Sequence, residues 1–172
     1  MIEKNYVIVD LETTGLSPLK NEIIEIGAIK VENGEIVDTM DIFIKPKTPV
    51  SKFITRLTGI TNEMLEDGFD IQDGMSKFVE FSKGYTLMAH NARFDMSFLN
   101  SSMNNCFNQN LENECLDTLK ISKELVKGLS SYKLESLANY FNVDYTGAHR
   151  AIKDCEITFD VYNNLMKLQS DI

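Results

Sequence analysis

The sequence has few of the residues that cross-link or stiffen small secreted proteins. Its 172 residues include three cysteines, three prolines and no tryptophan. The cysteines, Cys106, Cys115 and Cys155, are odd in number and widely spaced, so they form neither a disulfide framework nor a CxxC metal site. We therefore expect a reducing, cytoplasmic environment.

Long apolar runs and positive charge are also scarce. No apolar stretch approaches the ~18 residues of a membrane span, and residues 1–5 lack a basic-then-apolar secretion signal, so we expect no membrane association. The 17 Lys and Arg against 26 Asp and Glu give a net charge of −9, which argues against general electrostatic attraction to nucleic acid. An enzyme that meets phosphate through bound cations stays compatible with this charge, because the ions supply the positive charge.

The remaining composition is that of an ordinary globular protein. Hydrophobic residues make up 43% and charged residues 25% of the chain. A chain of this length can form one full hydrophobic core, and it contains no repeat or low-complexity linker. We predict a single domain over residues 1–172.

Five segments have the pattern of β-strands. Residues 6–12 are an apolar, β-branched run typical of a strand buried on both faces. Residues 22–32 and 35–44 are joined by Asn33-Gly34, a strong hairpin signal, so the chain opens with a three-stranded antiparallel meander. Residues 85–89 and 115–116 predict two further short strands.

Helical patterns alternate with the later strands. The predicted helices are residues 52–57, 62–66, 71–83, a segment through Phe94 to about 104, 118–126, 133–141 and 150–168. Residues 104–113 are rich in asparagine and are predicted to be a loop. The order of elements predicts an α/β fold, with a mixed five-stranded sheet, antiparallel and then parallel, that is flanked by helices.

Four acidic residues stand where such a sheet gathers ligands. Asp10 and Glu12 end the first strand, and side chains two residues apart point to the same side of a strand. Asp95 follows the fourth strand, and Asp154 lies in the last helix. Two divalent cations would balance four carboxylates, and oxygen ligands alone favour Mg²⁺ or Mn²⁺.

A histidine precedes the last of these acids by five residues. On a continuous helix His149 and Asp154 would lie 140° apart, so they converge only if His149 sits before the helix. Gly147-Ala148 makes that entry possible. A histidine beside a metal site suits a general base near neutral pH. The alternative is a helix-entry histidine that bonds to the backbone.

Three segments carry a resemblance to a known family. They are Asp10-Leu-Glu12-Thr-Thr-Gly15, His90-Asn-Ala-Arg-Phe-Asp95 and His149-Arg-Ala-Ile-Lys-Asp154. In order and spacing they resemble the three motifs of the DEDDh 3′→5′ exonucleases of the DnaQ-like superfamily, which includes the bacterial DNA polymerase III epsilon subunit and PolC-type exonuclease domains. Leu57-Thr-Gly-Ile-Thr61 is similar to a further family segment. The resemblance covers residues 5–168 and implies a ribonuclease H-like fold.

The resemblance also implies roles for the site residues. Asp10, Glu12, Asp95 and Asp154 would hold two metal ions, and His149 would deprotonate the water that attacks the terminal phosphodiester. The residues implied in substrate binding are Thr13, Thr14, Gly15, Leu16, Ile60, His90, Asn91 and Phe94. Thr14 would bond near the 3′-OH, while Leu16 and Ile60 would lie against the last bases. Phe94 suits core packing equally well, and His90 could instead end its strand.

Neighbouring charges have simpler interpretations. Asp117 precedes a helix and is assigned to helix capping. Arg93, Arg150 and Lys153 lie beside the motifs and either contact phosphates or cover solvated helix faces.

The implied partner is the 3′ end of a nucleic acid, with DNA favoured over RNA. An exoribonuclease resembling oligoribonuclease or ribonuclease T is the main alternative, because nothing in the motifs senses the 2′-OH. A binding module that lacks catalysis is a further alternative, although all five motif residues are present. Association with DNA polymerase III is implied by the family. The sequence ends at Ile172 without a long polymerase-docking tail or a clamp-binding peptide, so a free-standing enzyme fits at least as well.

Overall fold

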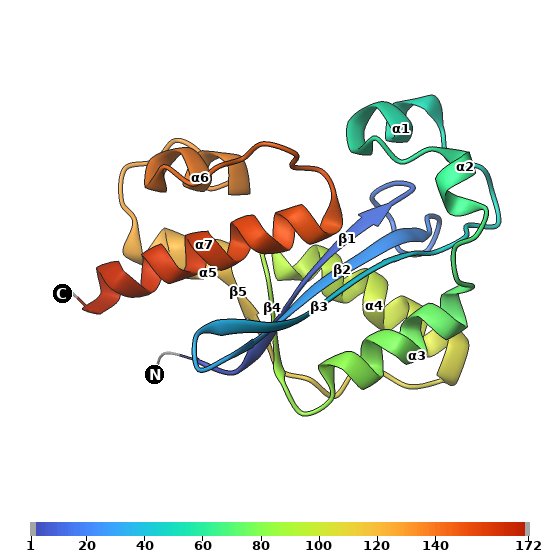
Figure 1. Cartoon of the computed structure of the whole chain (residues 1–172), viewed down its shortest axis with the longest axis horizontal. Helices are drawn as coiled ribbons and strands as arrows, with labels where there is room; N and C mark the ends of the chain where they lie inside the picture. The colour runs from blue at the N-terminus through green and yellow to red at the C-terminus, as the bar shows by residue number, and fades with distance from the viewer. Residues whose placement is uncertain (1–2, 171–172) are drawn as a thin grey trace.

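The chain folds as a five-stranded mixed sheet with helices on both faces (Figure 1). The computed structural model describes residues 3–170. In chain order the elements are β1 (Tyr6–Thr13), β2 (Ile23–Glu32), β3 (Glu35–Phe43), α1 (Lys52–Thr58), α2 (Asn62–Leu65), α3 (Ile71–Ser82), β4 (Thr86–Ala89), α4 (Ala92–Phe107), β5 (Cys115–Asp117), α5 (Thr118–Leu125), α6 (Leu134–Phe141) and α7 (Ala151–Ser170). The sheet order is β3-β2-β1-β4-β5, with β1–β3 antiparallel and β4 and β5 parallel to β1. The predicted fold class is confirmed.

Strand β1 lies at the centre of the sheet and is buried on both faces. Its side chains alternate, so Tyr6 and Ile8 pack toward α7 while Val7 and Val9 pack toward α3 and α4. Continuing this alternation, Asp10 and Glu12 emerge on the α7 face. The geometry of the strand therefore directs both carboxylates toward the last helix.

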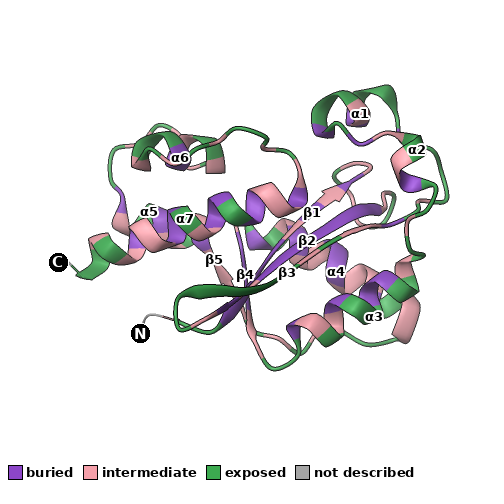
Figure 2. Cartoon of the chain, viewed as in Figure 1, coloured by how far each residue is buried: buried purple, intermediate pink, exposed green. Residues whose placement is uncertain are grey.

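Helices form one layer on each face of the sheet (Figure 1). Helix α7 lies across β1 and β2, with α5 and α6 packed against it, and α3 and α4 cover the opposite face. Helices α1 and α2 pack over Ile24 of β2. Figure 2 shows that the sheet-facing side of α7 is buried and that most of the edge strand β3 is exposed. Within residues 3–170 no helix is long and apolar enough to cross a membrane.

The structure corrects one predicted boundary. Residues 104–107 continue α4 rather than beginning a loop. The helix ends where Asn108 adopts the left-handed conformation (φ 55°) and its N–H bonds to the Asn104 carbonyl. Asparagine tolerates that conformation better than most residues, and Asn108 therefore serves as the C-cap of α4.

Candidate active site

Three of the four predicted carboxylates meet at the carboxyl end of β1. Asp10 and Glu12 come from β1, and Asp154 comes from the first turn of α7. Each offers a carboxylate oxygen, and these oxygens lie within 4.8 Å of one another. Asp154 is buried, whereas Asp10 and Glu12 keep some access to solvent. The prediction that residues 144 positions apart share one site agrees with this geometry.

The fourth carboxylate, Asp95, approaches the same strand end from the other side. It lies in the first turn of α4, is 3% exposed, and accepts a hydrogen bond from the Leu11 N–H at 3.2 Å. Leu11 separates Asp10 from Glu12 in β1, so Asp95 is anchored beside the cluster without belonging to its closest group. The helix that carries Asp95 begins directly after β4, which is parallel to β1 and next to it.

Burial, with smaller effects from neighbouring carboxylates, raises the pKa values of all four carboxyl groups. Burial, with the charges of Asp95 and Asp154, raises the pKa of Asp10 well above its usual range. Burial and then the Asp154 charge raise the pKa of Glu12 to about 8, and burial raises the pKa of Asp95 to about 8. Burial also raises the pKa of Asp154 to about 6. The four acids therefore oppose one another near neutral pH unless positive charge enters the site.

This donor set fits hard divalent cations. Carboxylate oxygens are the preferred ligands of Mg²⁺ and Mn²⁺, and the positive charge of a bound cation would counter the burial and the neighbouring negative charges that raise these pKa values. Asp10, Glu12 and Asp154 are close enough together to share an ion, and Asp95 stands beside them. The structure thus brings together the residues that the sequence proposed as metal ligands.

His149 lies before α7, as its spacing from Asp154 requires. It is exposed and adopts a left-handed backbone conformation (φ 67°), which turns the chain into the helix two residues later. Its N–H donates to the Asp154 carboxylate at 3.2 Å, and its ring meets the Tyr145 ring edge-on at a centroid distance of 6.3 Å. Within residues 3–170 no hydrogen bond engages either ring nitrogen.

The turn after β1 exposes an apolar side chain beside the carboxylates. Thr13 donates its hydroxyl hydrogen bond to the Gly15 carbonyl, and Thr14 accepts one from the Glu22 N–H at 2.9 Å. A side chain at Gly15 would approach the Asn21 carboxamide to 2.6 Å and would displace it from its hydrogen bond with the Ser17 N–H. These bonds hold the turn that carries Leu16, which is 86% exposed.

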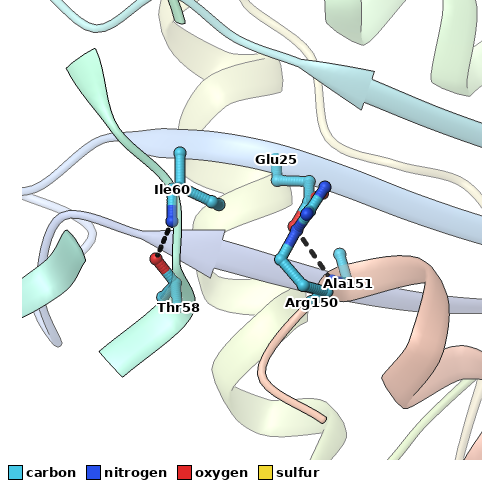
Figure 3. A network of polar contacts seen from close by, with 5 residues as sticks. All are labelled: Glu25, Thr58, Ile60, Arg150 and Ala151. Carbon is cyan, nitrogen blue, oxygen red and sulfur yellow. Dashed lines mark hydrogen bonds and ion pairs between the residues drawn. The ribbon is translucent and has the colours of Figure 1, made fainter. Parts of the chain in front are cut away.

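Two predicted substrate contacts, Ile60 and His90, are engaged within the protein in this structure. Ile60 has no exposed surface and belongs to one apolar cluster with Ile24 and Ile54, so in this structure it is a core residue and offers no surface to a base. Figure 3 shows its N–H bonded to the Thr58 hydroxyl. Both ring nitrogens of His90 are occupied, by the Thr118 hydroxyl and by a main-chain carbonyl, each at 2.9 Å. His90 therefore ends its strand and leaves no ring nitrogen for a phosphate.

Residues near the start of α4 have mixed roles. Phe94 is half-buried and its ring packs 5.0 Å from that of Phe98, so it contributes to the core while its outer face stays accessible. Asn91 is exposed and left-handed (φ 65°), and its N–H donates to Asp117. Asp117 also accepts from the Leu119 N–H at the start of α5, which confirms its assignment as a helix cap.

One buried acid near the site is not among the predicted site residues. Glu25 of β2 has no exposed surface and forms an ion pair with Arg150 (Figure 3). The Arg150 guanidinium is therefore engaged within the protein and is not a free ligand for a phosphate. The Nζ atom of Lys153 lies 3.4 Å from Oε2 of Glu156, so this lysine also forms an ion pair within the protein. The signal in the sequence was a single ionisable residue inside the apolar run of residues 23–29.

A groove lies away from the acids. An open groove of about 960 Å³ is lined by residues that include Gly84, Tyr85, Leu111 and Asn113, at the amino end of β4. It contains none of the four carboxylates. Because β4 runs parallel to β1, this groove lies at the amino ends of these strands, whereas the carboxylates lie at the carboxyl end of β1. The carboxylates are therefore the candidate active site.

Comparisons with known proteins agree with this architecture. The family model described as Exonuclease (RNase_T) matches residues 7–162. The PolC-type DNA polymerase III of Caldanaerobacter subterraneus subsp. tengcongensis is 43% identical over 171 residues, which are 99% of this chain but only 12% of that protein. The chain therefore spans about an eighth of the curated relatives it matches.

Solved structures extend the likeness to the whole fold. Exonuclease X in complex with 5′ overhanging duplex DNA is 26% identical with a TM-score of 0.79, over 96% of this chain and 93% of that chain. The nuclease domain of 3′hExo, a DEDDh family member bound to rAMP, has a TM-score of 0.81 at 22% identity, over 97% and 92% of the two chains. The ribonuclease H-like fold predicted from the three motifs is thus confirmed.

Proposed function

We propose that this chain, which belongs to the exonuclease family, removes nucleotides one at a time from the 3′ ends of DNA. The reaction hydrolyses the terminal phosphodiester bond and releases a nucleoside 5′-monophosphate. The observation that carries the proposal is the cluster of Asp10, Glu12 and Asp154, with the exposed His149 beside it. Clustered carboxylates next to a free imidazole provide both the means to hold cations and a proton acceptor.

The four acids would hold two divalent cations, Mg²⁺ or Mn²⁺. When bound, such ions increase the acidity of water and offset the negative charge of a phosphodiester that is being displaced. Asp10 and Glu12 would contribute from β1, Asp154 from α7, and Asp95 from α4. Three separate elements thus converge, so the spacing of the oxygens depends on how the helices pack on the sheet.

His149 would act as the general base. Its imidazole takes a proton from the attacking water while the water oxygen bonds to phosphorus and the bond from phosphorus to the 3′ oxygen breaks. The released oxygen becomes the new 3′-hydroxyl after it takes a proton from solvent. The hydrogen bond from the His149 N–H to Asp154 fixes the backbone of the base relative to a proposed metal ligand.

The turn after β1 would receive the last nucleotide. Leu16 offers an exposed apolar surface against which a base can stack without regard to its identity. Gly15 lets the backbone approach closely, and the Thr14 hydroxyl keeps its proton for donation near the 3′-hydroxyl because it accepts from Glu22. The nucleotide would also contact Asn91, Phe94 and Thr13.

DNA is the proposed substrate because the curated relatives are DNA polymerases. The chain is similar to one segment of these much longer proteins, which supports action on 3′ ends that a polymerase produces, including mismatched ends. We further propose that residues 1–172 act as one exonuclease domain, either free or associated with a polymerase.

Matched 5′-labelled DNA and RNA oligonucleotides test the proposal. Each is offered single-stranded, as a paired duplex and as a duplex with a mismatched 3′ end, with Mg²⁺, Mn²⁺ or EDTA. We expect a metal-dependent ladder that shortens DNA from the 3′ end and no ladder with EDTA. The Asp10→Ala variant should fold normally and give no ladder, because a ligand is lost.

The different oligonucleotides distinguish the proposed function from its alternatives. Shortening of RNA alone would replace the proposed substrate with RNA. A ladder that the Asp10→Ala variant makes at the wild-type rate would show that the carboxylate cluster is not the active site. Shortening from the 5′ end would refute the proposed direction.

A further inference from the structure

A buried acid next to the site has no role in the proposed reaction. Glu25 lies in β2 with no exposed surface, directly opposite Glu12 of β1 in the antiparallel register. Its side chain points to the α7 face, because odd-numbered residues of β2 such as Ile29 pack there. A buried carboxylate is costly unless it is paired and hydrogen-bonded, so its partners indicate its purpose.

Both oxygens of Glu25 are bound by the segment that enters α7 (Figure 3). Arg150 donates from Nη2 to Oε1 at 2.7 Å and from Nε to the same oxygen at 3.0 Å. The Ala151 N–H donates to Oε2 at 2.9 Å. The carboxylate therefore caps the first turn of a helix that lies 126 residues further along the chain. With its oxygens engaged in this way, Glu25 is not available as a metal ligand.

These bonds lie between the two functional residues of the last motif. His149 immediately precedes Arg150, and the Asp154 N–H bonds to the Arg150 carbonyl at 3.0 Å. The Asp154 side chain in turn accepts the His149 N–H. Residues 149–154 thus form one hydrogen-bonded turn, and Glu25 is its anchor on the sheet.

The sheet also lets this turn approach closely. A side chain at Gly27, two residues from Glu25, would come within 2.4 Å of the Ala151 carbonyl carbon and 2.5 Å of the Ile152 nitrogen. The first residues of α7 therefore pack directly against the backbone of β2 at Gly27, and the neighbouring Glu25 side chain binds the same residues by hydrogen bonds. Asp10 is paired with Gly27 and Glu12 with Glu25 across the strands, so the anchor lies directly opposite one of the proposed ligands.

Stability alone is a poor explanation for this pair. The Glu25 side chain is fully buried and that of Arg150 is 34% exposed, and ion pairs withdrawn from water often add little stability, so this pair is better explained by the geometry that it specifies. We propose that Glu25 is a positioning residue that, through Arg150 and Ala151, sets the place of His149 and Asp154 against Asp10 and Glu12. This inference rests on the proposed function of the same site.

Mn²⁺ binding to the Glu25→Gln variant tests the inference. Glutamine keeps the shape and an acceptor oxygen but loses the charge that holds Arg150. We expect the affinity for Mn²⁺, measured by electron paramagnetic resonance of the free ion, to fall about 10-fold to 100-fold, as is usual when a group that orients a metal ligand is removed. We expect kcat on a DNA oligonucleotide to fall with it, while KM stays within about threefold.

Two further variants separate positioning from general stability. Glu156→Gln breaks the exposed ion pair with Lys153 on the same helix and should leave Mn²⁺ affinity and kcat unchanged. Arg150→Lys keeps the charge but cannot make both side-chain bonds to Glu25, so its Mn²⁺ affinity should lie between those of the wild type and Glu25→Gln. This variant also serves as the test if Glu25→Gln fails to fold.

The outcomes distinguish this inference from the proposed function. A folded Glu25→Gln protein with a lower melting temperature but wild-type Mn²⁺ affinity and kcat would overturn the positioning role. Wild-type protein that binds Mn²⁺ yet degrades no oligonucleotide would overturn the proposed function, and the comparison of Mn²⁺ affinities would still decide the role of Glu25.

Discussion

Replacing Glu12 by glutamine should stabilise the metal-free protein. Burial and neighbouring carboxylates raise the pKa of Glu12 from 4.5 to about 8 in the folded chain. Between these values the folded protein holds a proton that the unfolded chain has released, so the free energy of unfolding falls as pH rises. Glutamine has nearly the same shape and carries no charge, so it removes this penalty.

The size of the effect follows from the pKa of Glu12. One pKa unit corresponds to about 1.4 kcal/mol, which sets an upper bound of about 4 kcal/mol at pH 8. Because the Glu12 side chain keeps some contact with water, we expect on the order of 2–3 kcal/mol. At pH 5 the difference should shrink to below about 1 kcal/mol, because Glu12 then keeps most of its proton in the folded state.

Urea unfolding in EDTA, followed by circular dichroism at pH 5 and pH 8, measures this difference. Glu124→Gln removes an exposed carboxylate of α5 and should change the free energy of unfolding by less than about 0.5 kcal/mol at either pH. Saturating Mn²⁺ should stabilise the wild type more than Glu12→Gln, which has lost a ligand. A Glu12→Gln protein that is no more stable than the wild type at pH 8 in EDTA would refute the argument that the acids repel one another.

Two further predictions concern α7. His149→Ala should lower kcat by about 10²-fold to 10⁴-fold, the usual contribution of a general base. The melting temperature should not change, because His149 is exposed. A loss of kcat of less than threefold near pH 7 would reassign His149 to a structural role. Gly27→Ala should destabilise the fold by about 1–3 kcal/mol in urea unfolding, because its Cβ would meet the α7 backbone at 2.4 Å; unchanged stability would mean that α7 moves away freely.

The strands and the acidic cluster could be predicted because local patterns determine them. The Asn33-Gly34 turn fixes the hairpin of β2 and β3, since both residues adopt positive φ angles there. The alternation of β1 fixes the side on which Asp10 and Glu12 emerge. The rotation per residue of a helix alone requires His149 to precede α7, and in the structure α7 begins at Ala151.

Residues whose roles depend on tertiary contacts could not be assigned from the sequence. The exposure of Ile60 depends on how the α1–α2 segment packs on Ile24, and no pattern around residue 60 reports that packing. The two partners of His90 come from positions 28 and 42 residues further along the chain. Glu25 is the exception, because a lone carboxylate within an apolar strand is costly without a partner and could have been flagged.

The entry of α7 contributes charge to the site as well as ligands. The first N–H groups of a helix lack partners within the helix and together carry about half a positive charge. Here the Ala151 N–H bonds to Glu25, and the N–H of His149 just before the helix bonds to Asp154. The positive end of a 20-residue helix therefore faces the acids of β1 and β2. A shift of α7 away from the sheet would remove Asp154 and this compensating charge together, so we expect the proposed metal site and the docking of α7 to be gained or lost together.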